Sequence, residues 1–345
     1  MSGAGVGLLS ARGTVRELAA HIVAACFDRA GTQCAFAGGD GAVHVADVGA
    51  PADWQRIEAH DGAVLAMVAD AREHGFITGG DDGALQRISA GGGVSRLFAS
   101  GGKWVEQLAS FAERRDGLIA CAVGKQAHIF DAAGVRLKSL PHPSTVTGLA
   151  FDAKGKRLAA SHYNGASLWF TQSKTDNPRV LEWKGSHIGV CLHPAMEAVV
   201  TAMQENALHG WRLADTQHMR MSGYPAKCES MGFTRSGKWL ASGGADCIVL
   251  WPFFGGGPMG KPPVELAQIE NILCTRVACH PKDELVAAGF ADGSVLIAQI
   301  ATQRVVVVAE AGAAPVSALA WSPDGARLAF GTEHGQAALV DLSAK

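Results

Sequence analysis

The sequence predicts an all-β fold built from a series of similar units with short strands. Segments 145–170 and 228–253 share one order: an apolar strand, a polar turn with Gly, a second strand, a tight turn and a third strand with a Trp near its end. Glycine occupies 43 of 345 positions, above its average share of roughly 7%, as many tight turns require. Hydrophobic residues make up 48% and charged residues 18%, so the chain can bury a substantial core.

One position near the end of each first strand sets the period of the repeat. Successive copies of this position are 42, 41, 41, 41, 41, 46 and 42 residues apart. The 46-residue interval contains a Gly/Pro-rich insertion at 253–263. The sequence therefore contains eight repeats, whose marker residues are Phe27, Ala69, Ser110, Phe151, Leu192, Phe233, Cys279 and Trp321.

A tight turn thirteen residues after the marker supports the same register. In five repeats this position holds Asp, Asn or His followed by Gly. Such pairs tolerate the positive φ angles of a two-residue hairpin, so they predict the turn between the second and third strands. The five pairs are Asp40-Gly41, Asp82-Gly83, Asn164-Gly165, Asp292-Gly293 and His334-Gly335.

Fourth strands are predicted at 94–100, 179–185, 263–269 and 304–311, but the last repeat has none. The N-terminal segment 14–20 is similar to 263–269 and precedes the first repeat. We expect it to pair with the last hairpin and close a ring, which removes an exposed sheet edge. The predicted domain is therefore 14–343, preceded by a flexible tail at 1–13.

The chain resembles the WD-repeat β-propeller family over about 14–343. The match is carried by the period, the Asp-Gly hairpins, the "SPDG" turn at 322–325, and Trp169, Trp211 and Trp251 near the ends of third strands. The resemblance implies a single propeller of four-stranded antiparallel blades. The repeat count predicts eight blades, and seven, the usual number in the family, is the alternative.

The family's buried His-Asp-Ser-Trp network is expected in few blades. Its opening Gly-His pair survives only as Ala59-His60 and Pro141-His142. The resemblance implies that His60 bonds to Asp82 and that His142 bonds to Asn164.

The resemblance also implies that one rim of the ring binds a partner protein. This rim carries the strand entries and the second-to-third-strand turns. Trp104 and Tyr163 would be aromatic anchors, and Glu106, Lys227 and Glu229 would give specificity. Equivalent entry positions hold Thr147, Thr275 and Ser317. The candidate partner-binding residues are Trp104, Glu106, Lys125, His162, Tyr163, Glu205, Lys227, Glu229 and Glu333.

The composition argues against several other classes of partner. Thirty basic and 32 acidic residues give no footprint for nucleic acid or an anionic membrane. No apolar run approaches the length of a membrane span. The eight cysteines form no C-x-x-C pair, which favours reduced thiols in a cytoplasm. No His/Cys cluster has zinc-like spacing, so no metal or cofactor is expected.

The expected function is a non-catalytic scaffold, monomeric on its own, that binds a partner of unknown identity. The alternative is a propeller enzyme of quinoprotein or lactonase type, with a metal or cofactor over the central channel. The insertion at 253–263 is either a second contact site or a loop that folds back over the bottom of the channel.

Overall fold

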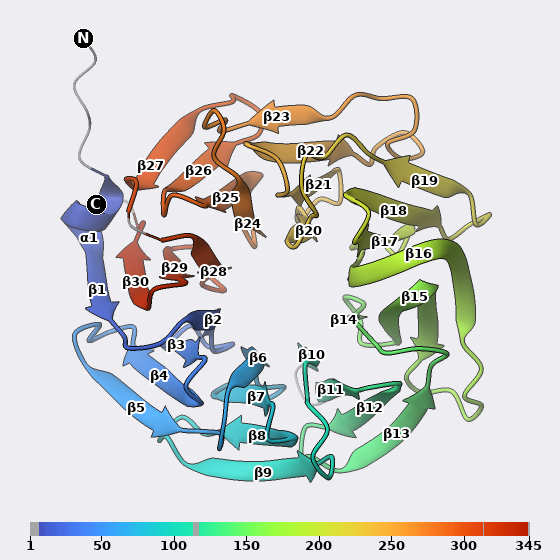
Figure 1. Cartoon of the computed structure of the whole chain (residues 1–345), viewed down its shortest axis with the longest axis horizontal. Helices are drawn as coiled ribbons and strands as arrows, with labels where there is room; N and C mark the ends of the chain where they lie inside the picture. Colours follow the sequence, from blue (N-terminus) through green and yellow to red (C-terminus); the bar gives the residue numbers. More distant parts are fainter. Residues whose placement is uncertain (1–6, 113–116, 313, 344–345) are drawn as a thin grey trace.

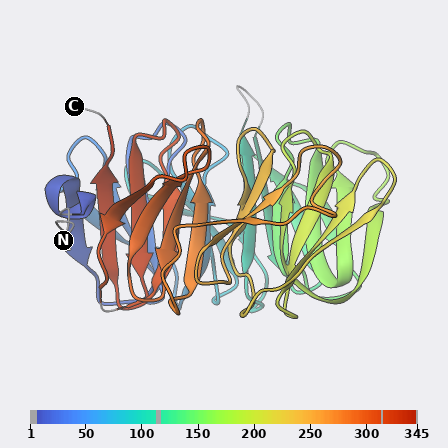
Figure 2. The same ribbon diagram turned by 90° about the horizontal axis from the view of Figure 1, so that it is seen from above.

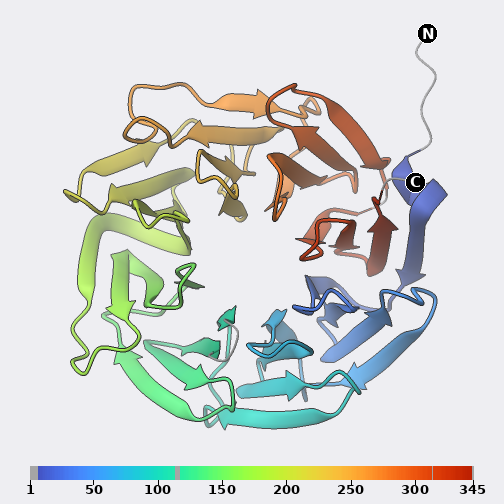
Figure 3. The same ribbon diagram turned by 180° about the vertical axis from the view of Figure 1, so that it is seen from behind.

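The computed structural model describes residues 7–112, 117–312 and 314–343, which form a ring of antiparallel sheets around a central axis (Figure 1). Figure 3 shows the same ring from behind, with the first strand of each repeat nearest the axis. The only helix of the described residues is the short α1 (Leu8–Arg12). The prediction of an all-β fold is confirmed.

Six of the sheets contain four strands each. The first three are β2 (Ile22–Phe27), β3 (Gln33–Gly38), β4 (Ala42–Asp47) and β5 (Trp54–Glu58); β6 (Val64–Ala69), β7 (Phe76–Gly80), β8 (Ala84–Ile88) and β9 (Val94–Ala99); and β10 (Gln107–Ala112), β11 (Gly117–Val123), β12 (Gln126–Asp131) and β13 (Arg136–Pro141). The other three are β20 (Met231–Phe233), β21 (Trp239–Ser242), β22 (Ile248–Pro252) and β23 (Val264–Leu266); β24 (Cys274–Cys279), β25 (Leu285–Phe290), β26 (Val295–Gln299) and β27 (Val305–Ala309); and β28 (Val316–Trp321), β29 (Arg327–Thr332), β30 (Gln336–Asp341) and β1 (Gly13–Glu17).

The prediction of eight separate four-stranded blades is wrong. The described strands form seven hydrogen-bonded sheets, because the fourth and fifth repeats share one six-stranded sheet. Its strands are β14 (Gly148–Phe151), β15 (Arg157–Phe170), β16 (Arg179–Leu192), β17 (Ala198–Met203), β18 (Ala207–Arg212) and β19 (His218–Met221). The number of sheets matches the alternative of seven.

The fusion has a local cause in two unusually long strands. β15 and β16 are each 14 residues long. β15 continues through the Asn164-Gly165 turn, and β16 continues through Gly185, all three at positive φ. Tyr163 pairs with Ser186 across this point, so the hydrogen-bonded ladder runs on where other repeats have a loop.

The N-terminal strand closes the ring, as the sequence predicts. β1 pairs antiparallel with β30, from Gly13 opposite Val340 to Glu17 opposite Gln336. The predicted flexible tail, 1–13, lies outside the described residues over 1–6. Its remainder includes α1, whose Leu8 and Leu9 pack against the apolar cluster between the last two sheets.

The core lies between the faces of neighbouring sheets, where apolar side chains of one sheet meet those of the next. The loops gather at the two edges of the ring, seen edge-on in Figure 2. We call the edge with the turns between second and third strands the hairpin rim, and the other edge the opposite rim. These two rims carry the loops, and exposed side chains also lie on outer strands such as β13.

Candidate functional site

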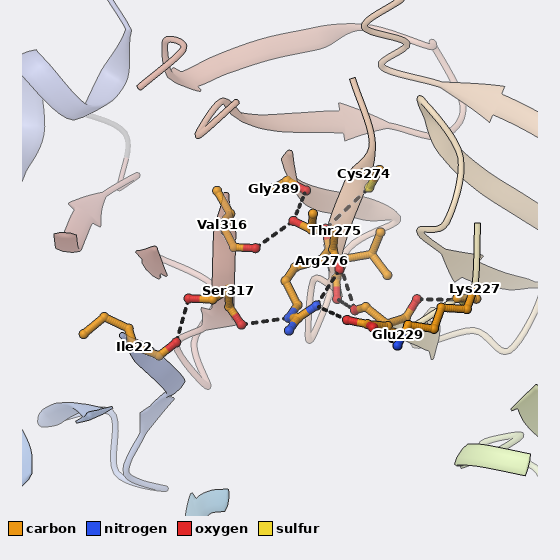
Figure 4. Close-up of polar contacts among 12 residues, drawn as sticks. Ile22, Lys227, Glu229, Cys274, Thr275, Arg276, Gly289, Val316 and Ser317 are labelled. Atoms are coloured by element: carbon orange, nitrogen blue, oxygen red, sulfur yellow. Dashed lines mark hydrogen bonds and ion pairs between the residues drawn. The ribbon is translucent and has the colours of Figure 1, made fainter. Parts of the chain in front are cut away.

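Three of the predicted rim positions hold neighbouring innermost strands together. The hydroxyl of Thr275 donates to the carbonyl of Val316 (2.7 Å), and that of Ser317 donates to the carbonyl of Ile22 (2.6 Å) (Figure 4). Thr147 donates in the same way to the carbonyl of His187 in the next repeat. These hydrogen bonds join the innermost strands of neighbouring repeats, and we call the three side chains clasps. Ser317 joins the last repeat to the first.

Two predicted residues, Lys227 and Glu229, come together near the axis of the ring. Lys227 Nζ lies 2.8 Å from Glu229 Oε1, and Arg276 Nη1 lies 3.5 Å from Glu229 Oε2 (Figure 4). The hydrogen bond from Lys227 lowers the pKa of Glu229 below its ordinary value, and Arg276 adds to this effect. Arg276 Nε also donates to the Ser317 carbonyl (2.7 Å), which fixes the guanidinium between repeats. Glu229 is thus already paired within the chain.

A groove of about 470 Å³ opens on the hairpin rim of the six-stranded sheet. We call it the rim groove. The hairpin at its edge is anchored because the Tyr163 N–H donates to Ser144 Oγ (2.8 Å). The other wall is held by Glu205, whose Oε1 accepts from the Ser186 N–H (3.1 Å). The groove is lined by Tyr163, Trp183, Lys184, Gly185, Met203, Glu205, Ala207 and Arg220.

Tyr163 and Glu205, both predicted from the sequence, line this groove. Tyr163 is 55% exposed, so its ring is free for contact. An exposed aromatic ring, apolar walls and charges of both signs are the composition that interface hot spots favour.

A stacked pair of rings supports one wall of the groove. Trp183 lies flat on His209, with ring centroids 3.9 Å apart, and His209 Nε2 is hydrogen-bonded to His218 Nδ1 (3.0 Å). Burial, and secondly the proximity of His218, lowers the pKa of His209 to about 3. His209 is therefore neutral near pH 7 and supports Trp183 as an uncharged surface. Neither Trp183 nor His209 was predicted as a site residue from the sequence, although Trp183 lies within a predicted fourth strand.

The remaining candidates are spread around the ring. His162 is 2% exposed, with Nε2 hydrogen-bonded to Ser167 Oγ (2.9 Å), so its prediction as a surface residue is wrong. It points inward because side chains alternate along β15 and Tyr163 points outward. Trp104, Lys125 and Glu333 are exposed, and Glu106 is partly buried. None of these four lines the rim groove.

In some repeats, a buried polar network forms around the residue nine positions before the marker residue. His60 is hydrogen-bonded to Asp82 (3.0 Å) and Thr78 (2.9 Å), which confirms the predicted His60–Asp82 bond. The predicted His142–Asn164 bond is wrong, because Trp169 Nε1 donates to His142 Nε2 (3.0 Å).

Repeat six has the same kind of network with Tyr in place of His. Trp251 Nε1 donates to the Tyr224 hydroxyl (2.6 Å), which is hydrogen-bonded to Ser242 (2.7 Å). Tyr224 was not predicted from the sequence. It could have been found only from its place nine residues before the marker Phe233. These networks lie in the core and act in stability.

All eight cysteines are free thiols, and most are buried. Burial raises the pKa of Cys121 to about 12, and that of Cys26 to the same value. These thiols are therefore protonated and unreactive near neutral pH. Among the described residues, no three His, Cys, Asp or Glu side chains converge as metal ligands.

The closed ring of antiparallel sheets defines a β-propeller. Its shape is similar to that of the computationally designed Ika8 protein, with a TM-score of 0.75 and 17% sequence identity over 94% of this chain and 98% of that one. At this identity the likeness shows the fold alone. Within 7–112, 117–312 and 314–343, no helix is long and apolar enough to cross a membrane.

Two sequence comparisons agree with this fold. A model of the anaphase-promoting complex subunit 4 WD40 domain matches residues 277–345. Autophagy-related protein 16 of Arabidopsis thaliana is 21% identical over 294 residues, which cover 81% of this chain. The chain spans only about half the length of that relative, 56%. Together with the fold, these matches show that the chain is a WD-repeat β-propeller protein.

Proposed function

We propose that this protein is a non-catalytic scaffold that binds a partner protein through the rim groove. The observation that carries the proposal is the half-exposed Tyr163 beside a concave, largely apolar surface supported by the Trp183–His209 stack. Aromatic anchors in preformed pockets supply most of the binding energy in protein interfaces. Lys184, Glu205 and Arg220 border the groove and would select the partner by charge.

The groove suits one or two large side chains of a partner rather than a small metabolite held in an enclosed cavity. Its volume is in the range of peptide and ligand pockets, but its polar groups do not form a catalytic constellation of nucleophile, base and oxyanion donors. The near balance of 30 basic and 32 acidic residues favours a protein over nucleic acid or a membrane surface. The buried, protonated thiols suit a reducing cytoplasm.

Affinity purification from the native cell, with quantitative mass spectrometry, tests this proposal. Tyr163→Ala and Lys184→Glu are each compared with wild type and with Leu137→Ala. Leu137 is a matched control because it is 52% exposed on β13, away from the groove. We expect a partner that the wild type and Leu137→Ala recover equally and the two groove variants lose by about tenfold or more.

Two outcomes would overturn the proposal. Equal recovery of every partner by Tyr163→Ala and wild type would remove the rim groove from the interface. Stoichiometric metal or a chromophore in the purified protein, with turnover, would favour the propeller enzyme.

A further inference from the structure

A second groove lies on the opposite rim, beneath the same six-stranded sheet. It has a volume of about 500 Å³, and its apolar lining includes Leu168, Phe170, Met196 and Leu213. Met196 belongs to a first-to-second-strand turn, and Leu213 is tied to that turn by the hydrogen bond from its N–H to the Glu197 carbonyl (2.8 Å). We call this surface the opposite-rim groove. It is on the other edge of the ring from Tyr163.

Two half-exposed phenylalanines on this rim each lie beneath a cation: Phe170 lines the groove, and Phe254 belongs to the insertion at 253–263. The Arg157 guanidinium lies 5.3 Å from the centre of the Phe170 ring. Lys261 Nζ lies 5.0 Å from the centre of the Phe254 ring. Arg212 lines the groove and donates from Nη1 to the Gly256 carbonyl (3.3 Å), which ties the insertion to the edge of the groove.

The insertion at 253–263 adjoins the groove and is held in place by several contacts. Lys261 Nζ donates to the carbonyls of Phe254 and Gly257, the latter at 2.9 Å. The ring of Phe254 packs edge-on against Trp239, with centroids 5.3 Å apart. Through Arg212 the insertion lies against the fifth repeat. The loop is therefore held by Trp239, by Arg212 and by its own backbone, rather than by folding back over the bottom of the channel.

The surface has more cations than its own carboxylates neutralise. Arg179 lines the groove and donates to Thr216 Oγ1 (2.9 Å), and it has no carboxylate partner among the described residues. Lys156 is exposed next to Phe170, since its carbonyl accepts from the Thr171 N–H (3.0 Å). Lys238 is exposed beside the start of the insertion, since its carbonyl accepts from the N–H of the buried Phe253 (2.7 Å).

The nearby acids are largely used within the chain. Asp215 is paired with Arg212, and the buried Asp152 lies 3.4 Å from Arg157. Glu197 is the carboxylate that lines the groove itself. Apart from the exposed Glu197, an incoming ligand therefore meets apolar walls bordered by Arg179 and Lys156, which have no carboxylate partner among the described residues.

We propose that the opposite-rim groove binds an acidic amphipathic segment of a partner protein. Its apolar side chains fill the groove beside Phe170 and extend to Phe254 on the adjoining insertion, and its carboxylates meet Lys156, Arg179 and Lys238. Apolar burial supplies affinity and the complementary charges set orientation and association rate. A concave apolar groove favours such a segment over a polyanion, which needs a broad cationic stripe. This second surface is independent of the rim groove.

Fluorescence anisotropy with a defined probe tests the proposal. The probe is a fluorescein-labelled peptide of about 16 residues with Leu and Phe at helical spacing and Asp or Glu elsewhere. The control peptide has Lys and Arg in place of the acids. We expect the full chain to bind the acidic peptide at least about tenfold more tightly than the basic one.

Variants locate the binding. Phe170→Ala combined with Arg179→Glu should weaken acidic-peptide binding at least about tenfold. Leu137→Ala combined with Arg136→Glu removes an exposed apolar and cationic pair on β13 and should bind as wild type. If this double variant fails to fold, the single variant Phe254→Ala is tested as well. Thermal melting checks that each protein is folded.

The outcomes are distinct. Equal affinity for the acidic and basic peptides, or unchanged binding by both groove variants, would overturn the proposal. So would single-stranded RNA or anionic vesicles that bind this surface more tightly than the peptide, because the ligand would then be a polyanion. Tyr163→Ala should leave peptide binding unchanged, so failure of the rim groove and failure of this surface can be told apart.

Discussion

Replacing Ser317 with Ala should destabilise the ring without affecting partner binding. The Ser317 side chain is 4% exposed, and its hydroxyl donates to the Ile22 carbonyl at 2.6 Å and to the Gly331 carbonyl at 3.3 Å. Loss of this donor leaves a buried carbonyl without its partner, which costs about 1–3 kcal/mol. In a chain of 345 residues, such a loss lowers the Tm by about 1–4 °C.

Differential scanning calorimetry measures this change, and Ser95→Ala, an exposed serine on β9, is the matched control. Thr275→Val removes the neighbouring clasp to Val316 and should lower the Tm by a similar amount. Tyr163→Ala should show the opposite behaviour, with an unchanged Tm and lost partner recovery. A Tm for Ser317→Ala equal to that of Ser95→Ala would refute the assignment of these hydroxyls as clasps.

Three further perturbations test other parts of the structure. Glu229→Gln should lower the free energy of unfolding by no more than about 1 kcal/mol, since its pair with Lys227 is half-exposed; a larger loss in urea denaturation would contradict this. Burial lowers the pKa of His142 to about 4, so only the unfolded chain gains this proton between pH 6.5 and 4, and stability falls by about 3 kcal/mol over that range. His142→Gln, which keeps an acceptor for Trp169, should flatten the pH dependence of the Tm, and an unchanged slope would count against it. Removing 1–17 exposes the edge of β30 and should produce aggregates in light scattering; a monomer with the wild-type Tm would rule this out.

The repeat and its closure could be predicted because both follow from local signals. The hairpin pairs fix the register, and the similarity of 14–20 to a fourth strand points to its pairing with β30. The fusion of repeats four and five could not be predicted in this way. Asn164-Gly165 looks like the other hairpin pairs, and the difference arises from the pairing of Tyr163 with Ser186, which is a tertiary contact.

The candidate site was predictable only in part. Tyr163 and Glu205 stand at hairpin turns, so the repeat places them on the rim. His162 was misplaced because neighbouring residues of a strand face opposite sides. Trp183 and Arg220 were missed since they lie on fourth strands, where the repeat gave no rim position.

The hydrogen bonds of the polar side chains near the axis could likewise not be predicted from the sequence. The sequence shows a hydroxyl at positions such as Thr275 and Ser317 but not its direction. That direction depends on the carbonyl presented by the next repeat, which is 41 residues away in the chain for Thr275 and 295 residues away for Ser317.

Site-specific photo-crosslinking in the native cell tests the central claim most directly. A photoreactive phenylalanine analogue is placed at Tyr163 in one protein and at Leu137 in another, two positions of similar exposure. The rim groove as the partner interface predicts a discrete protein adduct from position 163 and none from position 137. Equal labelling at the two positions, or adducts from 137 alone, would contradict it.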